Sequence, residues 1–450
     1  MIAPARLAAF QALRLVDAGR LDLASALAHT RTPLADGRDR ALALELVAGS
    51  LRWQRMLDHV LEHVSSRALE TIDRDLLIVL RLSLYQLLHL TRVPAAAVVD
   101  DAVDLTRAAR KPGATGFVNA VLRAALRQRH RLALPPRPGD RTDRDAWIRH
   151  LGVAHSHPDW LVERLLDRHG VDAAERWVQF DNEVPRLTVR ANTLRLSRDE
   201  LRRALSAAGI EATPTRFAPL GLTIVSGHPR RLPADGSFVV QGEASQIVPS
   251  VVGARPGEVV LDLCASPGGK TTALAAEMRD SGLLVASDVR PRRVRLLNEA
   301  VRLSGVRCVR LVQVASSGAL PFSATFDRVL VDAPCSGLGT VRREPDIRWR
   351  RVETDLPELA ARQRRLLSRA AAVVRPGGRL VYATCSSEPE ENEQVVEAFL
   401  AEHAGWVPVD LREEMPAGLR ALLDERGCLR TLPHAHGLEA FFAAALTREA

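Results

Sequence analysis

The 450-residue sequence lacks long apolar runs and has only five cysteines and few aromatic residues. No stretch of about 18 uncharged apolar residues is present, so no transmembrane helix is expected. Charges at Arg6, Arg14 and Asp17 interrupt any signal-peptide core, and we therefore expect a cytoplasmic protein with no membrane partner. All cysteines lie in the C-terminal half without a Cys-x-x-Cys pair, so neither disulfides nor a bound metal are expected.

Basic residues outnumber acidic ones, and nearly all of them are arginine. The chain has 62 basic and 54 acidic residues and a formal net charge of +8, with lysine only at Lys111 and Lys270. A basic balance favours a polyanionic partner such as RNA. Residues 123–149 alone hold eight arginines against three aspartates, which suits either a solvated face or contact with RNA.

The first region of the chain has a purely helical pattern. From residue 4 to about 130, apolar residues recur at the i, i+3, i+4 and i+7 spacing of amphipathic helices, without the alternation typical of strands. This pattern predicts an all-α bundle of about six helices in a domain of residues 1–132. We expect this domain to bind RNA. A structural or dimerising module would have the same pattern, although we expect the chain to be a monomer.

Residues 133–236 begin with a proline-rich linker and then mix helical and strand patterns. The strand–helix–strand order with glycine turns predicts linker helices followed by a small α+β, RRM-like domain. Arginines crowd its first predicted strand and helix, and we interpret them as a surface that could follow an RNA backbone. These arginines are Arg186, Arg190, Arg195, Arg198, Arg202 and Arg203.

Residues 237–450 alternate predicted strands with predicted helices. This order predicts a doubly wound, Rossmann-like α/β domain with ligands at the carboxyl ends of its strands. Its first strand ends in a glycine loop that opens a helix, where backbone N–H groups favour a negative group. A P-loop is excluded because Cys264 stands where that motif needs its first glycine, and the Gly-x-Gly-x-x-Gly fingerprint is also missing.

The next predicted strand ends in Asp288, 20 residues after Gly268. A carboxylate at this position typically accepts hydrogen bonds from ribose hydroxyls. The loop and the aspartate together predict a nucleoside cofactor without a large phosphate group, and S-adenosylmethionine fits. The predicted cofactor-binding residues are Cys264, Ala265, Ser266, Pro267, Gly268, Gly269, Lys270, Asp288 and Asp332.

Two further strands end in cysteine motifs, Asp332-Ala333-Pro334-Cys335 and Ala383-Thr384-Cys385. Carbon 5 of a pyrimidine is too weak a nucleophile to take a methyl group directly, whereas a thiolate that adds to carbon 6 activates it. An acid near N3 must assist this addition, and Asp332 could hydrogen-bond N3 and the exocyclic amine of cytosine. The catalytic candidates are therefore Cys335, Cys385 and Asp332, and the pattern does not rank the two cysteines.

Three motifs, LDLCASPGGKTT, DAPCSGLGTVRREPDIRW and VYATCSSEPEENE, resemble the Nol1/Nop2/Sun family of RNA 5-methylcytosine methyltransferases. The N-terminal stretches LRLSLYQLLHLTRVP and GFVNAVLR resemble the NusB fold. The combination is similar to the bacterial Sun type, which methylates a cytosine of 16S ribosomal RNA. The resemblance implies that Cys385 is the nucleophile, that Cys335 assists product release and that residues 237–450 form the S-adenosylmethionine-dependent catalytic domain.

The chain departs from the family pattern at two positions. Ser317 stands where the family usually has an aspartate near the adenine, and Glu439-Ala440-Phe441-Phe442 replaces a late Asp-Gly-Phe-Phe. We expect the second stretch to be a core strand. The leading hypothesis is an RNA (cytosine-5-)methyltransferase that acts on 16S ribosomal RNA. The alternatives are the same reaction on transfer RNA, or an RNA-binding assembly factor without activity.

Overall fold

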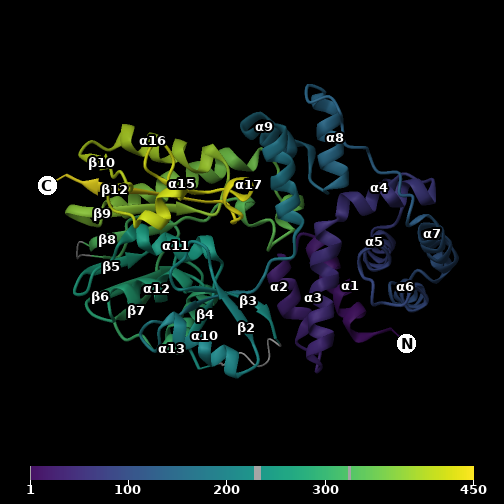
Figure 1. The fold of residues 1–450 in the computed structure, drawn as a ribbon, viewed down its shortest axis with the longest axis horizontal. Helices are drawn as coiled ribbons and strands as arrows, with labels where there is room; N and C mark the ends of the chain where they lie inside the picture. The colour runs from purple at the N-terminus through teal and green to yellow at the C-terminus, as the bar shows by residue number, and fades with distance from the viewer. Residues whose placement is uncertain (1, 228–234, 323–325, 450) are drawn as a thin grey trace. The chain divides into compact units, whose positions relative to one another are not determined.

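A computed structural model describes residues 2–227, 235–322 and 326–449 (Figure 1). The chain packs into two compact units. The first unit consists of Met1–Val184 and Val341–Glu353, and the second consists of Pro185–Thr340 and Thr354–Ala450. The predicted domain boundaries at 132 and 236 stay predictions.

The first unit begins with a helical bundle around one apolar core. Its helices are α1 (Pro4–Asp17), α2 (Leu23–Arg31), α3 (Gly37–Arg52), α4 (Gln54–Ser65), α5 (Arg74–His89), α6 (Ala95–Ala108) and α7 (Thr115–Gln128). Sequence periodicity misses α2, which has only nine residues and in which three of the five apolar residues are alanine. The Asp22 carboxylate begins this helix by accepting the Ser25 N–H at 2.7 Å, and Leu23 and Leu27 attach it to the core.

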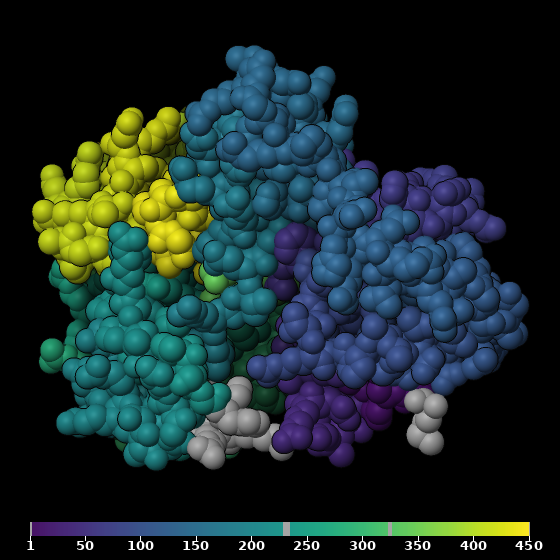
Figure 2. Space-filling model, turned by 45° about the vertical axis from the view of Figure 1, so that its right-hand side comes forward, coloured from purple at the N-terminus to yellow at the C-terminus, as the bar shows by residue number. Residues whose placement is uncertain are grey.

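Two more helices, α8 (Arg144–Ala154) and α9 (Asp159–Asn182), complete the N-terminal part of this unit, which ends at Val184. Helix α8 begins inside the predicted linker, where the Asp143 carboxylate accepts the Ala146 N–H at 3.0 Å. Gly170, with φ of +71°, interrupts α9 and divides it into the two helices that the sequence predicts. Side chains of the blue segment that contains α8 and α9 form a continuous surface in Figure 2.

A segment distant in sequence, Val341–Glu353, also packs in the first unit and contains the short helix α14 (Ile347–Arg350). The Arg348 side chain is fully buried there, and burial lowers the pKa of its guanidinium to about 9. The guanidinium donates hydrogen bonds to neutral acceptors from three parts of the unit. These are the carbonyl oxygens of Arg52, Ser156 and Asp181 and the side-chain oxygen of Asn182.

The second unit begins with a small antiparallel sheet in the order β2-β3-β1-β4. Its elements are β1 (Thr188–Ala191), α10 (Arg198–Ala207), β2 (Glu211–Pro214), β3 (Gly221–Ser226) and β4 (Phe238–Val240). The edge strand β2 was missed because it is four residues long, mostly exposed and ends in proline. Pairing across this sheet buries Val189, Ala191 and Leu222 against Leu201 and Leu205 of α10.

The larger sheet of this unit has a parallel centre and antiparallel additions at one side. Its strands are β5 (Val259–Asp262), β6 (Leu283–Asp288), β7 (Val309–Gln313), β8 (Phe326–Asp332), β9 (Val374–Thr384), β10 (Trp406–Pro408), β11 (Leu429–Thr431) and β12 (Phe441–Arg448). The order is β10-β12-β9-β8-β5-β6-β7, with β11 paired to β12. Strands β5 to β9 pair in parallel, and β12 pairs antiparallel with β9, so Phe441 and Phe442 lie in a core strand as predicted.

Helices cover both faces of this sheet (Figure 1). Helices α11 (Glu243–Val252), α12 (Gly269–Glu277) and α13 (Pro291–Ser304) pack on one face, and α15 (Asp355–Ala371) and α16 (Glu393–Glu402) pack on the other. Successive residues of β9, Val381 and Tyr382, belong to the two different cores, as the alternation along a strand requires. None of the described helices is long and apolar enough to cross a membrane.

Candidate active site

The glycine loop predicted from the sequence connects β5 to the N-terminus of α12. Gly268 has φ of +109°, a conformation that side chains other than glycine rarely adopt. A Cβ atom at this position would lie 2.9 Å from the Cβ of Ala300 and 3.1 Å from Leu297 Cδ1. The loop therefore needs glycine both for its turn and for its close approach to α13.

Asp262 ends β5 directly before this loop, and its side chain is fully buried. One carboxylate oxygen accepts the Thr271 hydroxyl at 2.7 Å, and the other has no hydrogen-bond partner among the described residues. Burial raises the pKa of Asp262 to about 7. Repulsion from Asp332 and Asp288 also raises the pKa, whereas the Thr271 hydrogen bond and the Lys270 charge lower it. The loop thus contains a buried acceptor that still lacks a donor.

Asp288 ends the neighbouring strand β6 and lines a cavity of about 290 Å³ together with Cys264. Its side chain is only 3% exposed. One oxygen accepts the Arg290 N–H at 3.2 Å, and Arg293 Nη1 lies 3.8 Å from the other. The cavity therefore runs from the glycine loop to this carboxylate, which is the arrangement that the sequence predicts for a nucleoside.

The loop after β7 contains the serine that departs from the family pattern. Ser316 lines the cavity beside Asp288, whereas Ser317 lines an adjoining cavity of about 860 Å³ that Ser316 also borders. Arg369 fixes this loop by donating to the carbonyl oxygens of Ala315 at 3.0 Å, Ser316 at 3.3 Å and Gly318 at 2.6 Å. Of these two serines, Ser316 is therefore the one that lines the cavity beside Asp288.

Lys270 and Asp332 form an ion pair, with 2.6 Å between Lys270 Nζ and Asp332 Oδ2. Burial alone would lower the pKa of Lys270, but the Asp332 carboxylate outweighs burial and the pKa stands above its ordinary value. The ammonium also lies 5.4 Å from the centre of the Phe441 ring. The sequence had predicted a cofactor contact for Lys270 and gave no sign of this pair.

The two motif cysteines lie side by side, with 3.4 Å between Cys335 Sγ and Cys385 Sγ. They follow the adjacent strands β8 and β9, in which Asp332 is opposite Ala383. The hydrogen bond with Cys385, followed by burial, raises the pKa of Cys335 well above its ordinary value. Cys335 is therefore a protonated thiol at neutral pH and can donate a hydrogen bond to the Cys385 sulfur.

Glu391 connects the two cysteine loops and was not identified from the sequence. It is fully buried, and its carboxylate accepts the N–H of Ser336 at 2.8 Å and the hydroxyl of Ser386 at 2.5 Å. These two serines each follow one of the cysteines. Gln363 of α15 donates to the same carboxylate at 2.8 Å and also to the Pro334 carbonyl oxygen at 3.1 Å. A single buried side chain thus fixes both loops.

Arg190 has a different place from the one that the arginine-rich stretch suggested. Its side chain is buried, so it does not contribute to a surface that follows RNA. The guanidinium donates to Gln241 Oε1 at 2.8 Å, to the Gly269 carbonyl oxygen at 3.2 Å and to Thr272 Oγ1 at 2.8 Å. Burial lowers the pKa of Arg190 to about 10. The small sheet therefore supports the first turn of α12, next to the glycine loop.

The strand ends of the larger sheet bring the predicted residues together in two groups. The first is Cys264 of the glycine loop with Asp288 at the cavity, and the second is Cys335, Cys385, Asp332 and Lys270. Their assignment to cofactor and substrate stays a prediction.

Comparison with known proteins agrees with this architecture. Residues 250–447 match the family described as 16S rRNA methyltransferase RsmB/F, residues 3–127 match the NusB family and residues 157–230 match the RsmF/B-like ferredoxin-like domain. The ribosomal RNA small subunit methyltransferase B of Pseudomonas putida is 35% identical over 92% of this chain and 92% of its own length. The chain belongs to the RsmB/F family of 16S rRNA methyltransferases.

Further relatives extend the similarity over nearly the whole chain. The ribosomal RNA small subunit methyltransferase B of Serratia proteamaculans is 32% identical over 97% of this chain and 96% of its own length. The crystal structure of PH0851 is 27% identical, covers 100% of this chain and 99% of its own, and superimposes with a TM-score of 0.81. The resemblance inferred from the motifs and the predicted fold classes are confirmed.

Proposed function

We propose that this RsmB/F family member transfers a methyl group from S-adenosylmethionine to carbon 5 of a cytosine in 16S ribosomal RNA, through a covalent bond between Cys385 and carbon 6. The observation that carries the proposal is the 3.4 Å separation of the two sulfurs at adjacent strand ends, beside the ion pair of Asp332 and Lys270. Two thiols and a carboxylate are the groups that this reaction requires.

The cavity and the glycine loop fit S-adenosylmethionine. Asp288 is suited to accept hydrogen bonds from ribose hydroxyls, and the N-terminus of α12 is suited to a carboxylate. The unpaired oxygen of Asp262 is the complement that an ammonium group requires. When bound, the cofactor would supply an electrophilic methyl group from its sulfonium and would leave as the neutral thioether.

In the first step, the Cys385 thiolate forms a bond to carbon 6 of the cytosine. The electron pair of the C5–C6 double bond moves into the rest of the ring and makes carbon 5 nucleophilic. N3 takes up a proton as negative charge develops on the ring. We assign the contact with N3 and the exocyclic amine to Asp332. The Lys270 ammonium, 2.6 Å from this carboxylate, keeps a proton near that edge of the base. Cytosine is preferred to uracil because its exocyclic amine donates to the carboxylate.

Release requires a second bond change at the same two carbons. After carbon 5 has taken up the methyl group, its proton passes to solvent and the C5–C6 double bond forms again. The Cys385 sulfur leaves carbon 6 as a thiolate, and N3 gives its proton back. The Cys335 thiol, which is protonated at neutral pH, can donate a hydrogen bond to the departing sulfur and so assist this step.

The two cysteine assignments are tested by trapping the covalent intermediate. Cys335→Ala should accumulate an RNA–protein adduct on a denaturing gel, because release is impaired while attack is retained. Cys385→Ala should form no adduct and show no turnover. An adduct with Cys385→Ala but not with Cys335→Ala would reverse the two roles.

The RNA is tested separately by bisulfite sequencing of total RNA from cells with and without the gene. A cytosine of 16S ribosomal RNA should lose its protection from bisulfite conversion in cells without the gene. Wild-type protein should restore this protection, whereas Cys385→Ala should not. Loss of protection in a transfer RNA instead would change the substrate while leaving the cysteine chemistry intact.

A further inference from the structure

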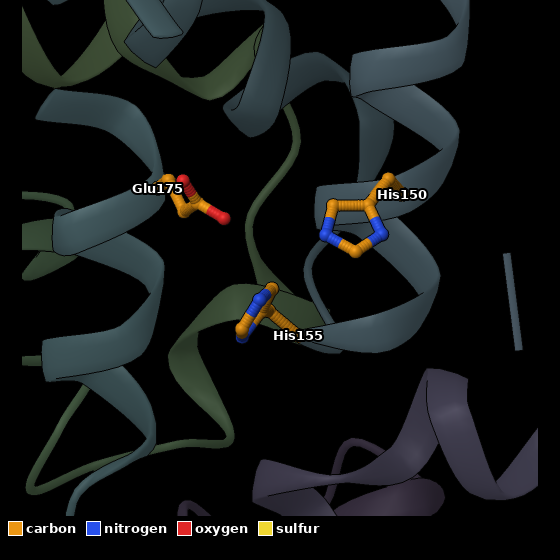
Figure 3. A group of neighbouring side chains, drawn as sticks. All are labelled: His150, His155 and Glu175. Atoms are coloured by element: carbon orange, nitrogen blue, oxygen red, sulfur yellow. The ribbon is translucent and has the colours of Figure 1, made fainter. Parts of the chain in front are cut away.

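A group of three potential metal ligands lies in the first unit, between α8 and the second half of α9. His150 belongs to α8, His155 follows directly after it, and Glu175 belongs to α9. One ligand atom of each residue lies within 4.8 Å of the ligand atoms of the other two. The three side chains point toward a common space (Figure 3). Local spacing does not reveal this group, because Glu175 is separated from the histidines by at least 20 residues.

Two of these side chains are oriented by neighbours in the way that protein metal ligands usually are. His150 Nδ1 lies 2.9 Å from the Pro135 carbonyl oxygen, which can only accept, so Nδ1 carries the proton and Nε2 keeps a lone pair in the neutral ring. Arg137 donates from Nε and Nη2 to the two oxygens of Glu175, each at 2.8 Å. Each carboxylate oxygen accepts one hydrogen bond there and has a further lone pair for a cation.

The third ligand, His155, has a ring that makes no hydrogen bond among the described residues. Its ring meets that of His150 edge to face, with 5.7 Å between the centroids. Two imidazoles and a carboxylate thus converge without hydrogen-bonding one another.

We propose that His150, His155 and Glu175 bind one divalent transition-metal ion, with zinc as the expected ion. Imidazole nitrogen favours zinc and its neighbours over magnesium and calcium, and two histidines with one carboxylate form a known zinc ligand set. Ligand atoms around tetrahedral zinc lie about 3.4 Å apart, given bonds of about 2.1 Å. Side-chain rotation has to close a remaining gap of up to about 1.4 Å between ligand atoms. The bound ion then links α8 to α9.

The test is calorimetric titration of zinc chloride into the full-length, chelator-treated protein. The two thiols of Cys335 and Cys385 could also bind zinc, so both are changed to serine in every protein compared. We expect one equivalent of zinc with a Kd below about 10 μM. His155→Ala should weaken binding at least tenfold, whereas His63→Ala, at an exposed histidine of α4, should leave it unchanged.

A second set of variants separates metal binding from folding. Glu175→Gln keeps the shape of the side chain and should weaken zinc binding at least tenfold without unfolding the unit. Arg137→Met removes the guanidinium that orients Glu175 and also lies over the Trp147 ring, and should weaken binding by about 10- to 100-fold. Cobalt(II) should give a visible absorption band that His155→Ala abolishes. No zinc binding, or equal binding by His155→Ala and His63→Ala, would overturn the proposal.

Discussion

Replacement of Glu391 should separate the contribution of the buried carboxylate from that of the cysteines themselves. Glu391→Ala removes the acceptor of the Ser336 N–H and the Gln363 amide, whereas the Ser386 hydroxyl can turn toward Ser336 Oγ at 3.2 Å. Two buried donors without partners cost roughly 1–3 kcal/mol each, so the variant should lose about 2–6 kcal/mol of stability. Glu391→Gln keeps one oxygen for both donors and should lose only about 1–2 kcal/mol.

The effect on catalysis should follow the position of the two sulfurs rather than the binding of the cofactor. We expect Glu391→Ala to reduce kcat by about 100-fold or more. The Kd for S-adenosylmethionine should change less than about twofold, because Glu391 contacts neither the glycine loop nor Asp288. Mild oxidation by diamide, followed by mass spectrometry, should join Cys335 to Cys385 more slowly in this variant.

The matched control is Glu397→Ala on α16, the helix that follows Glu391 in the chain. It removes an exposed carboxylate that pairs with Arg426. This variant should keep kcat and the rate of oxidation. Measurements are made at a temperature at which all the variants are folded by circular dichroism. If folded Glu391→Ala turned over at the wild-type rate, the carboxylate would not be what holds the two loops in position.

Three further outcomes are expected. The pKa of Asp262 is about 7 in the folded protein, against an ordinary 3.8, so Asp262 loses its proton at lower pH in the unfolded state. The free energy of unfolding should therefore fall by up to about 4 kcal/mol as the pH rises from 4 to 7. Asp262→Asn should flatten this pH dependence in urea unfolding of the cofactor-free protein. Lys270→Arg should weaken S-adenosylmethionine binding measurably in calorimetry, because the broader guanidinium has little room where the compact ammonium lies between Asp332 and the Phe441 ring. Unchanged affinity would return Lys270 to a structural role. Arg348→Ala should destabilise the first unit by about 3–5 kcal/mol in thermal unfolding, because it leaves buried acceptors unpaired, whereas the exposed Arg149→Ala should change stability by less than about 0.5 kcal/mol.

The sequence by itself determined the three kinds of fold and the loops that hold the site. Helical and strand patterns depend on neighbours a few residues apart, so periodicity was enough for most elements. It missed α2 and β2, which are short, and α8, which begins inside the proline-rich linker. The glycine loop, Asp288 and the two cysteines could be grouped because the carboxyl ends of parallel strands meet at one edge of a sheet.

Only the tertiary structure decided which side chains meet inside that edge. The pairs Lys270–Asp332 and Cys335–Cys385 join residues 62 and 50 positions apart. Glu391 is fixed by contacts with the two cysteine loops and with Gln363 of α15. The burial of Arg190 and the packing of Val341–Glu353 in the first unit likewise have no local signal. Such contacts depend on the path of the whole chain, and a local pattern of charge or polarity is the same whether a side chain faces water or a buried acceptor.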